Sequence, residues 1–216
     1  MKTTANPLIV LTLLAASVLA RAGTVEVPAM EKEKLCGRCQ YGAVPGSGAG
    51  SMKFVDASLP QAEVRVGATA EAGVGMGYLI GFELNPEMIN SLAMGTKVEL
   101  VVTVLKTALG GTPSPTSVAL LSSSSPAAPD MRPQFGAWNN APNLTEVGTF
   151  EADPEIGEAR FDVTEALQKG TPPSQKTPVI YFAIYAPKAD LVKENHGKHV
   201  IFGGQAADAP RLVITE

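Results

Sequence analysis

The chain is poor in cysteine, in positive charge and in long apolar runs. Its only cysteines are Cys36 and Cys39, and a zinc site needs more ligands than this pair supplies. The one long, mostly apolar run, residues 8–20, has 13 residues, whereas a membrane-spanning helix needs about 20. These shortages argue against a cysteine-built zinc site and against a membrane-spanning helix.

Residues 1–22 are predicted to be an export signal. Lys2 gives the segment a positive start, the apolar run follows, and Ala20-Arg21-Ala22 is a small-x-small cleavage site. The mature protein is then expected to begin near Gly23 and to be secreted, either extracellular or at the cell surface. An uncleaved anchor is the alternative, because Arg21 lies beside the cut.

The predicted mature chain has an excess of acidic residues. Removal of residues 1–22 leaves 15 basic and 21 acidic residues, a net charge of −6. Nucleic acids and anionic membranes are bound by basic patches, so neither is expected as a partner. The same acidity weakens the case for an acidic polysaccharide.

The composition divides the mature chain into a leader, residues 23–51, and a folded domain, residues 52–216. The leader holds the Cys36-x-x-Cys39 pair and ends in a Gly/Ser linker over residues 46–51. In an oxidising compartment we expect a local disulfide between Cys36 and Cys39. Linkage between chains, metal binding and redox catalysis are the alternatives.

Apolar and polar residues alternate with a period of two along much of the domain. Val64 and Val66, for example, alternate with Glu63 and Arg65, as in a strand with one face on a core. Residues 179–186 are apolar on both faces and predict a central strand. The pattern predicts an all-β fold, a jelly-roll-type antiparallel β-sandwich of about eight to nine strands.

One or two short helical turns are expected between the strands. Asn85 is a candidate N-cap, and Pro86 suits the first helical position that follows it. A second turn is predicted from Thr164 to Gly170.

Four stretches match the pattern of a known domain family. They are Trp138-Asn139-Asn140-Ala141-Pro142, Phe161-Asp162-Val163-Thr164 with Ala166-Leu167, Phe202 through Ala209-Pro210-Arg211-Leu212-Val213-Ile214, and Tyr78-Leu79-Ile80-Gly81-Phe82-Glu83-Leu84. Together they resemble the DNRLRE domains, extracellular sandwich domains related to carbohydrate-binding modules. The resemblance implies a jelly-roll sandwich in a secreted, often polysaccharide-directed protein.

The chain departs from this family at basic positions. Gly81 stands where a lysine is common, and Gly203-Gly204-Gln205 replaces a Ser-Arg-Glu stretch. The basic contacts that would hold an acidic glycan are therefore missing at the matched positions.

Four aromatic residues are the candidates for binding a sugar ring: Trp138, Tyr78, Tyr181 and Tyr185. A flat aromatic face stacks on a sugar with little loss of entropy. For Trp138, the only tryptophan, the competing and favoured interpretation is a plug at one end of the sandwich.

No cofactor is predicted. A structural calcium ion at Glu151, Asp153, Glu155 and Glu158 is a minor alternative to a solvated acidic turn. His196 and His199 would hold a transition metal only if further ligands converged on them, and a solvated turn is the favoured interpretation.

The sequence does not predict an enzyme. It contains no Gly-x-Ser-x-Gly motif, and only two histidines are present to serve as a base. We expect a secreted, non-catalytic module that binds a polysaccharide or surface glycan. The alternative is a self-associating structural subunit of an extracellular filament, coat or matrix, assembled through the leader or through sheet edges.

Overall fold

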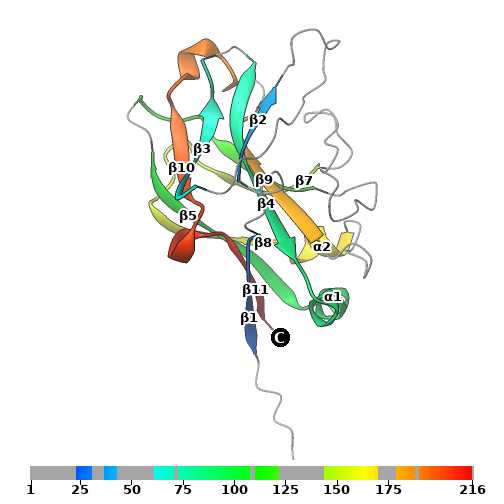
Figure 1. The fold of residues 1–216 in the computed structure, drawn as a ribbon. Helices are drawn as coiled ribbons and strands as arrows, with labels where there is room; N and C mark the ends of the chain where they lie inside the picture. Colours follow the sequence, from blue (N-terminus) through cyan, green and yellow to red (C-terminus); the bar gives the residue numbers. More distant parts are fainter. Residues whose placement is uncertain are drawn as a thin grey trace, which may run out of the picture.

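The computed structural model describes residues 23–30, 37–42, 61–70, 73–107, 110–121, 144–169, 179–187 and 190–215 (Figure 1). These residues form eleven strands, two short α-helices and two 3₁₀ turns. The strands are β1 (Thr24–Pro28), β2 (Gly37–Gly42), β3 (Glu63–Ala68), β4 (Val74–Glu83), β5 (Lys97–Thr107), β6 (Thr116–Leu121), β7 (Leu144–Phe150), β8 (Gly157–Asp162), β9 (Val179–Tyr185), β10 (His199–Gly203) and β11 (Arg211–Thr215).

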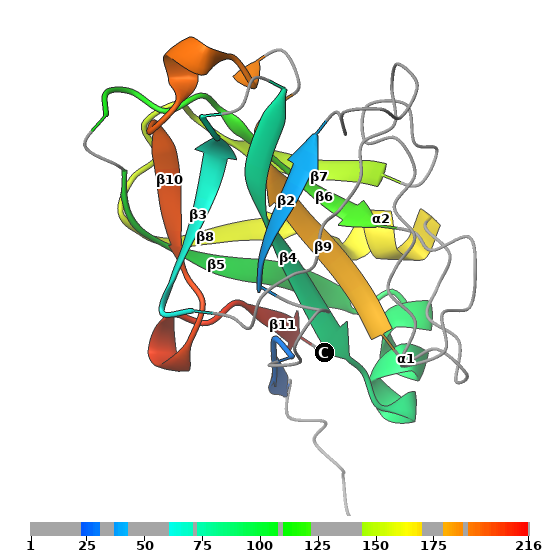
Figure 2. The same cartoon turned by 45° about the horizontal axis from the view of Figure 1, so that its top comes forward.

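All eleven strands belong to one antiparallel sheet. Its order is β1-β11-β5-β10-β3-β4-β9-β6-β7, while β2 pairs with β4 and β8 pairs with β5. Figure 2 shows the sheet strongly curved, so that β4 crosses in front of β5. The curvature brings the inner faces of strands that are distant in the sheet order onto the same core.

A single apolar cluster fills the space inside the curved sheet. Nine strands contribute buried side chains to it. The helices α1 (Pro86–Ala93) and α2 (Thr164–Lys169) cover one end through Ile89, Leu92 and Leu167. Phe150 and Phe202 are in contact, with ring centroids 5.1 Å apart. Burying each large apolar side chain contributes about 1.5–3 kcal/mol, so this cluster is the main source of stability.

The alternation seen in the sequence matches the two faces of the strands. Val64 and Val66 of β3 are fully buried, whereas Glu63 and Arg65 are exposed. β9 lies between β4 and β6, which confirms the prediction of a central strand over residues 179–186. A strand flanked on both sides and apolar on both faces tolerates little contact with water.

Both predicted helix starts are confirmed. In α1 (Pro86–Ala93), the side chain of Asn85 accepts a hydrogen bond from the backbone N–H of Met88 at 2.8 Å, the contact expected of an N-cap. α2 (Thr164–Lys169) begins at the predicted residue. The 3₁₀ turns η2 (Lys193–Asn195) and η3 (Ala206–Asp208) were not predicted.

The mostly-β, antiparallel character of the fold is confirmed, but the strand number is larger than expected. The described residues hold eleven strands rather than eight or nine. Residues 52–216 account for nine of them, β3 to β11, so the two additional strands come from the segment assigned to the leader.

The structure differs from the expected extended leader at β1 and β2. β1 pairs with β11, with Val25 opposite Ile214, and β2 pairs with β4, with Gly37 opposite Leu79. The sequence signal for these strands is weak, because β1 is only five residues long and β2 (GRCQYG) has only two apolar side chains, Cys39 and Tyr41, between two glycines.

Part of the predicted organisation lies outside the described residues. This holds for the export signal, the Gly/Ser linker and Cys36. Only the backbone of Cys39 is described, in β2 opposite Gly77. The Cys36–Cys39 disulfide therefore stays a prediction.

Candidate functional site

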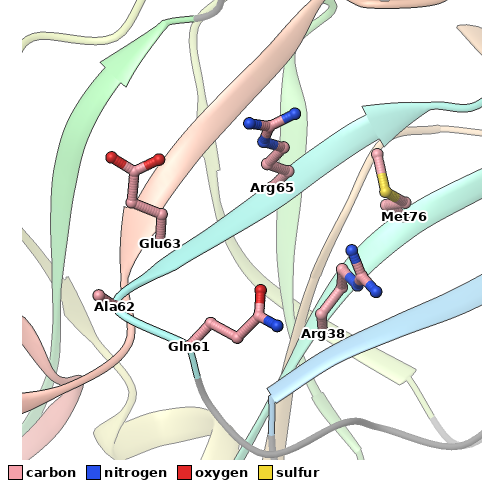
Figure 3. Close-up of a pocket in the computed structure, with 6 residues that line it drawn as sticks. All are labelled: Arg38, Gln61, Ala62, Glu63, Arg65 and Met76. Carbon is pink, nitrogen blue, oxygen red and sulfur yellow. The ribbon is translucent and has the colours of Figure 1, made fainter.

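An open hollow lies where β2, β3 and β4 meet (Figure 3). It encloses about 480 Å³ and is lined mainly by polar side chains. We call it the arginine hollow; its residues are Arg38, Gln61, Ala62, Glu63, Arg65 and Met76.

The strands place these side chains by simple alternation. Val64 and Val66 anchor β3 in the core, so Glu63 and Arg65 point outward. Arg38 comes from β2, opposite Tyr78 of β4. Figure 3 shows that both guanidinium groups extend away from the ribbon.

A lysine on a more distant strand completes the charge arrangement. Ile201 of β10 pairs with Arg65 on one side and with Lys106 of β5 on the other, so these three side chains share a row on the outer face. The ammonium group of Lys106 bonds to a carboxylate oxygen of Glu63 at 2.8 Å. The acidic group of the hollow is therefore held by Lys106 rather than by either arginine.

The two arginines have no such partner. Among the described residues, neither Arg38 nor Arg65 forms an ion pair or a side-chain hydrogen bond, and both are exposed. A guanidinium group presents five N–H donors in a planar fork that matches a carboxylate or an oxyanion. The hollow thus offers hydrogen-bond donors to a ligand.

Close backbone packing fixes one rim of the hollow. The N–H of Gly204 donates to the carbonyl of Ala62 at 3.2 Å. A Cβ atom at Gly204 would lie 2.3 Å from the carbonyl oxygen of Gln61, far inside contact distance. Any larger residue at position 204 would therefore force a shift of the segment that brings Gln61 and Ala62 to the hollow.

His199 is buried at the other end of β10, opposite Gly67 of β3. Its Nε2 bonds to the carbonyl oxygen of Ala68 at 2.9 Å, which makes Nε2 the protonated donor. Burial, together with the charges of Arg65 and His196, holds the pKa of His199 below its usual value, although the Ala68 bond opposes this. His196 itself is exposed.

On a second charged surface the arginines do have acidic partners. On the outer face of β1, β11, β5 and β8, the charged groups are paired with one another. We call it the ion-pair face; its contacts are Lys97–Glu99 at 3.0 Å, Arg160–Glu99 at 3.5 Å, Arg160–Glu158 at 3.3 Å, Arg211–Glu26 at 3.5 Å and Arg211–Glu158.

Glu158, one of the four acidic residues considered for calcium, belongs to the ion-pair face. Arg211 and, to a lesser extent, Arg160 lower the pKa of Glu158 by bonding to its carboxylate, and desolvation opposes them. Glu151, Asp153 and Glu155 are exposed. Among the described residues, no three His, Cys, Asp or Glu side chains gather closely enough to hold a metal ion.

Of the four aromatic candidates, the described Tyr78 lies on the opposite face of the sheet from Tyr181 and Tyr185. Tyr78 is only 2% exposed, in the core, and its hydroxyl donates to the carbonyl of Gly203 at 3.4 Å. Its ring therefore has no open face for a sugar. Tyr181 and Tyr185 are half-buried on the other face of the sheet, since β9 points Ile184 inward opposite Tyr78. Trp138 lies outside the described residues.

The residues of the arginine hollow were missed at the level of sequence. Alternation along β3 did place Arg65 on an exposed face, but nothing marked it as different from other exposed charges. Arg38 lies in the segment assigned to the leader, 27 positions before Arg65. Only the pairing of β2 and β3 with β4 brings the two together.

None of the helices among the described residues has the length and apolarity to cross a lipid bilayer. No family model matches the chain, and no curated protein matches it either. The resemblance to DNRLRE domains therefore stays a prediction based on the residues that carry it.

Proposed function

We propose that this protein is a secreted, non-catalytic β-sandwich module that binds a glycan at a cell surface or in an extracellular matrix, through the arginine hollow. The observation that carries the proposal is the hollow itself. It is open, it is built on paired strands, and its two arginines have no partner among the described residues.

The lining of the hollow suits a sugar. Sugar hydroxyls both donate and accept hydrogen bonds, and Arg38, Gln61 and Glu63 supply donors and acceptors of both kinds. Met76, half-buried at the side of the hollow, adds a soft apolar surface for C–H groups. Strand pairing fixes the backbone positions of Arg38 and Arg65 before the ligand arrives, which lowers the entropic cost of binding.

The finer fold assignment, a jelly-roll sandwich, belongs to the same proposal. It is supported by the single core that the curved sheet encloses and by β3 and β9, which follow one another as partners of β4. A strand that changes partner along its length is common where two layers of a sandwich meet.

A glycan array and a pull-down on insoluble polysaccharides test the binding function. We expect the chain from Gly23 onward to bind at least one glycan, and the double variant R38Q/R65Q to lose that binding. K169Q removes one positive charge from exposed α2, away from the hollow, and should bind normally. A folded protein that binds no glycan even at millimolar concentration would contradict the proposal.

A structural role is the second candidate, favoured by one edge of the sheet. Among the described strands, β1 pairs with β11 alone, and its Val25 is 40% exposed. An unpaired edge accepts a strand from another chain. Size-exclusion chromatography and negative-stain imaging should then show assemblies that Val25→Lys dissolves; a monomer at high concentration would exclude this role.

A further inference from the structure

We infer that the arginine hollow is an anion site: it selects glycans that carry a carboxylate or a sulfate ester over neutral glycans, and Lys106 keeps it open to them. The inference rests on the proposed glycan-binding function and adds the chemical class of the ligand. It starts from the charges that surround the hollow.

The local charge of the hollow is opposite to that of the chain. The whole chain has a net charge of −4, but Arg38, Arg65 and Lys106 face a single carboxylate, Glu63, which leaves two positive charges. Charges further away than the Debye length, about 8 Å at physiological salt, are largely screened. Among the described residues, the charges at the lining of the hollow and the one paired with it are therefore positive on balance.

The unpartnered state of the two arginines favours an ionised acceptor. Hydrogen bonds from a guanidinium group to a carboxylate or a sulfate are roughly twice as strong as those to a neutral hydroxyl. On the ion-pair face, Arg160 and Arg211 already hold carboxylates of this chain. Arg38 and Arg65 have no carboxylate among the described residues, so a ligand is the acceptor left to them.

Lys106 is a positioning residue in this arrangement. Glu63 lies two positions before Arg65 on the same face of β3, close enough for the two to pair if Glu63 were released. The 2.8 Å bond to Lys106 draws the carboxylate towards β5 instead. Lys106 does not line the hollow, so any effect of Lys106 on binding acts through Glu63.

The first experiment compares matched oligosaccharides by isothermal titration calorimetry: a neutral one, one with uronate carboxylates and one with sulfate esters. We expect an anionic oligosaccharide to bind at least tenfold more tightly than the neutral one. R38Q and R65Q should each weaken anion binding by about tenfold, and K169Q should not. The affinity should fall as the salt concentration rises.

The second experiment tests the role of Lys106. K106Q should weaken anion binding several-fold, because Glu63 is then free to pair with Arg65. The double variant E63Q/K106Q should restore the affinity, since no carboxylate remains to occupy the arginine. A purely structural role for Lys106 predicts no such rescue.

The outcomes separate this inference from the proposed function. Equal binding of neutral and anionic glycans, with R38Q and R65Q weakening both alike, overturns the anion site and leaves glycan binding intact. Failure to bind any glycan overturns both. Preference for the carboxylate or for the sulfate supports the inference and identifies the anionic group. Loss of affinity in K106Q without rescue in E63Q/K106Q overturns the part assigned to Lys106.

Discussion

Arginine side chains lie on both charged surfaces of this protein, but in two different states. On the ion-pair face, Arg160 and Arg211 are bound to Glu99, Glu158 and Glu26. In the arginine hollow, Arg38 and Arg65 have no acidic partner among the described residues, and the one carboxylate present is taken by Lys106. The same residue type thus ties strands together at one place and remains available at the other.

The cause of the difference is the cross-strand register. Arg211 of β11 lies opposite Val101 of β5. From there its side chain reaches Glu26 of β1 and Glu158 of β8, although Glu158 is 53 positions away in the chain. Next to Arg65, the register places Ile201 rather than an acid. Paired charges contribute to stability, whereas unpaired charges on a rigid scaffold are free to contribute to binding.

Removal of the Phe202 ring from the core should destabilise the ion-pair face and the arginine hollow together, because both surfaces depend on β10. Phe202 is fully buried, and β10 joins β5 of the ion-pair face to β3 of the hollow. Phe202→Ala should lower the free energy of unfolding by about 3–5 kcal/mol, as other buried Phe→Ala changes do. Chemical denaturation measures the loss; a change below about 1 kcal/mol would show that the two surfaces do not share this core.

A matched pair of arginine variants sharpens the comparison. Arg211→Gln removes two ion pairs from a side chain that is only 19% exposed, and should cost about 1 kcal/mol of stability. Arg65→Gln removes an equal charge with no described partner and should change stability by less than about 0.5 kcal/mol. Thermal melts of the two variants measure this; equal losses would contradict the assignment of separate roles.

The buried His199 of β10 predicts a pH effect near neutrality. The folded protein holds the pKa of His199 below its usual 6.5, so the unfolded chain binds the proton more readily. The stability supplied by the neutral ring is complete above the usual pKa of 6.5 and is lost as the pH falls from there through the lowered pKa of the folded protein. His199→Gln should flatten the profile of unfolding free energy against pH, measured by urea denaturation, between about pH 7 and pH 5. A profile as steep as that of the native chain would contradict this.

The ion-pair face predicts a smaller effect in acid. The lowered pKa of Glu158 means that its contribution is complete above its usual 4.5 and is lost as the pH falls through the lowered value. Urea denaturation between pH 5 and pH 3 should show a shallower loss for Glu158→Gln than for the native chain. Glu155→Gln, a change at an exposed position, is the control. An identical slope in both variants would mean that the arginines do not hold Glu158 in solution.

Local patterns predicted many elements of the fold. Alternation located β3, β5, β8 and β11, because one face of each strand packs on the core and the other is polar. The N-cap Asn85 located α1, because capping is a short-range interaction within one turn, and the start of α2 was placed at Thr164. β1 and β2 escaped prediction, because a short edge strand is stabilised by its neighbour rather than by its own composition.

The candidate site was less accessible to prediction than the fold. Tyr78 was chosen as an aromatic for its type, yet its place on the inner face of β4 buries it. Arg38 was passed over because its segment was assigned to the leader. In both cases the residue type was known, but the partner across the sheet was not.

The sequence by itself determined which segments alternate, where two helices begin and which residues are buried along a strand, since each depends on neighbours a few positions away. The tertiary structure alone decided which charges are paired. Lys106 meets Glu63 across 43 positions and Arg211 meets Glu158 across 53, and the folding of the sheet sets those distances. By the same geometry Arg38 and Arg65 have no acid beside them in the described part of the chain, because cross-strand register is a property of the whole sheet and of no single segment.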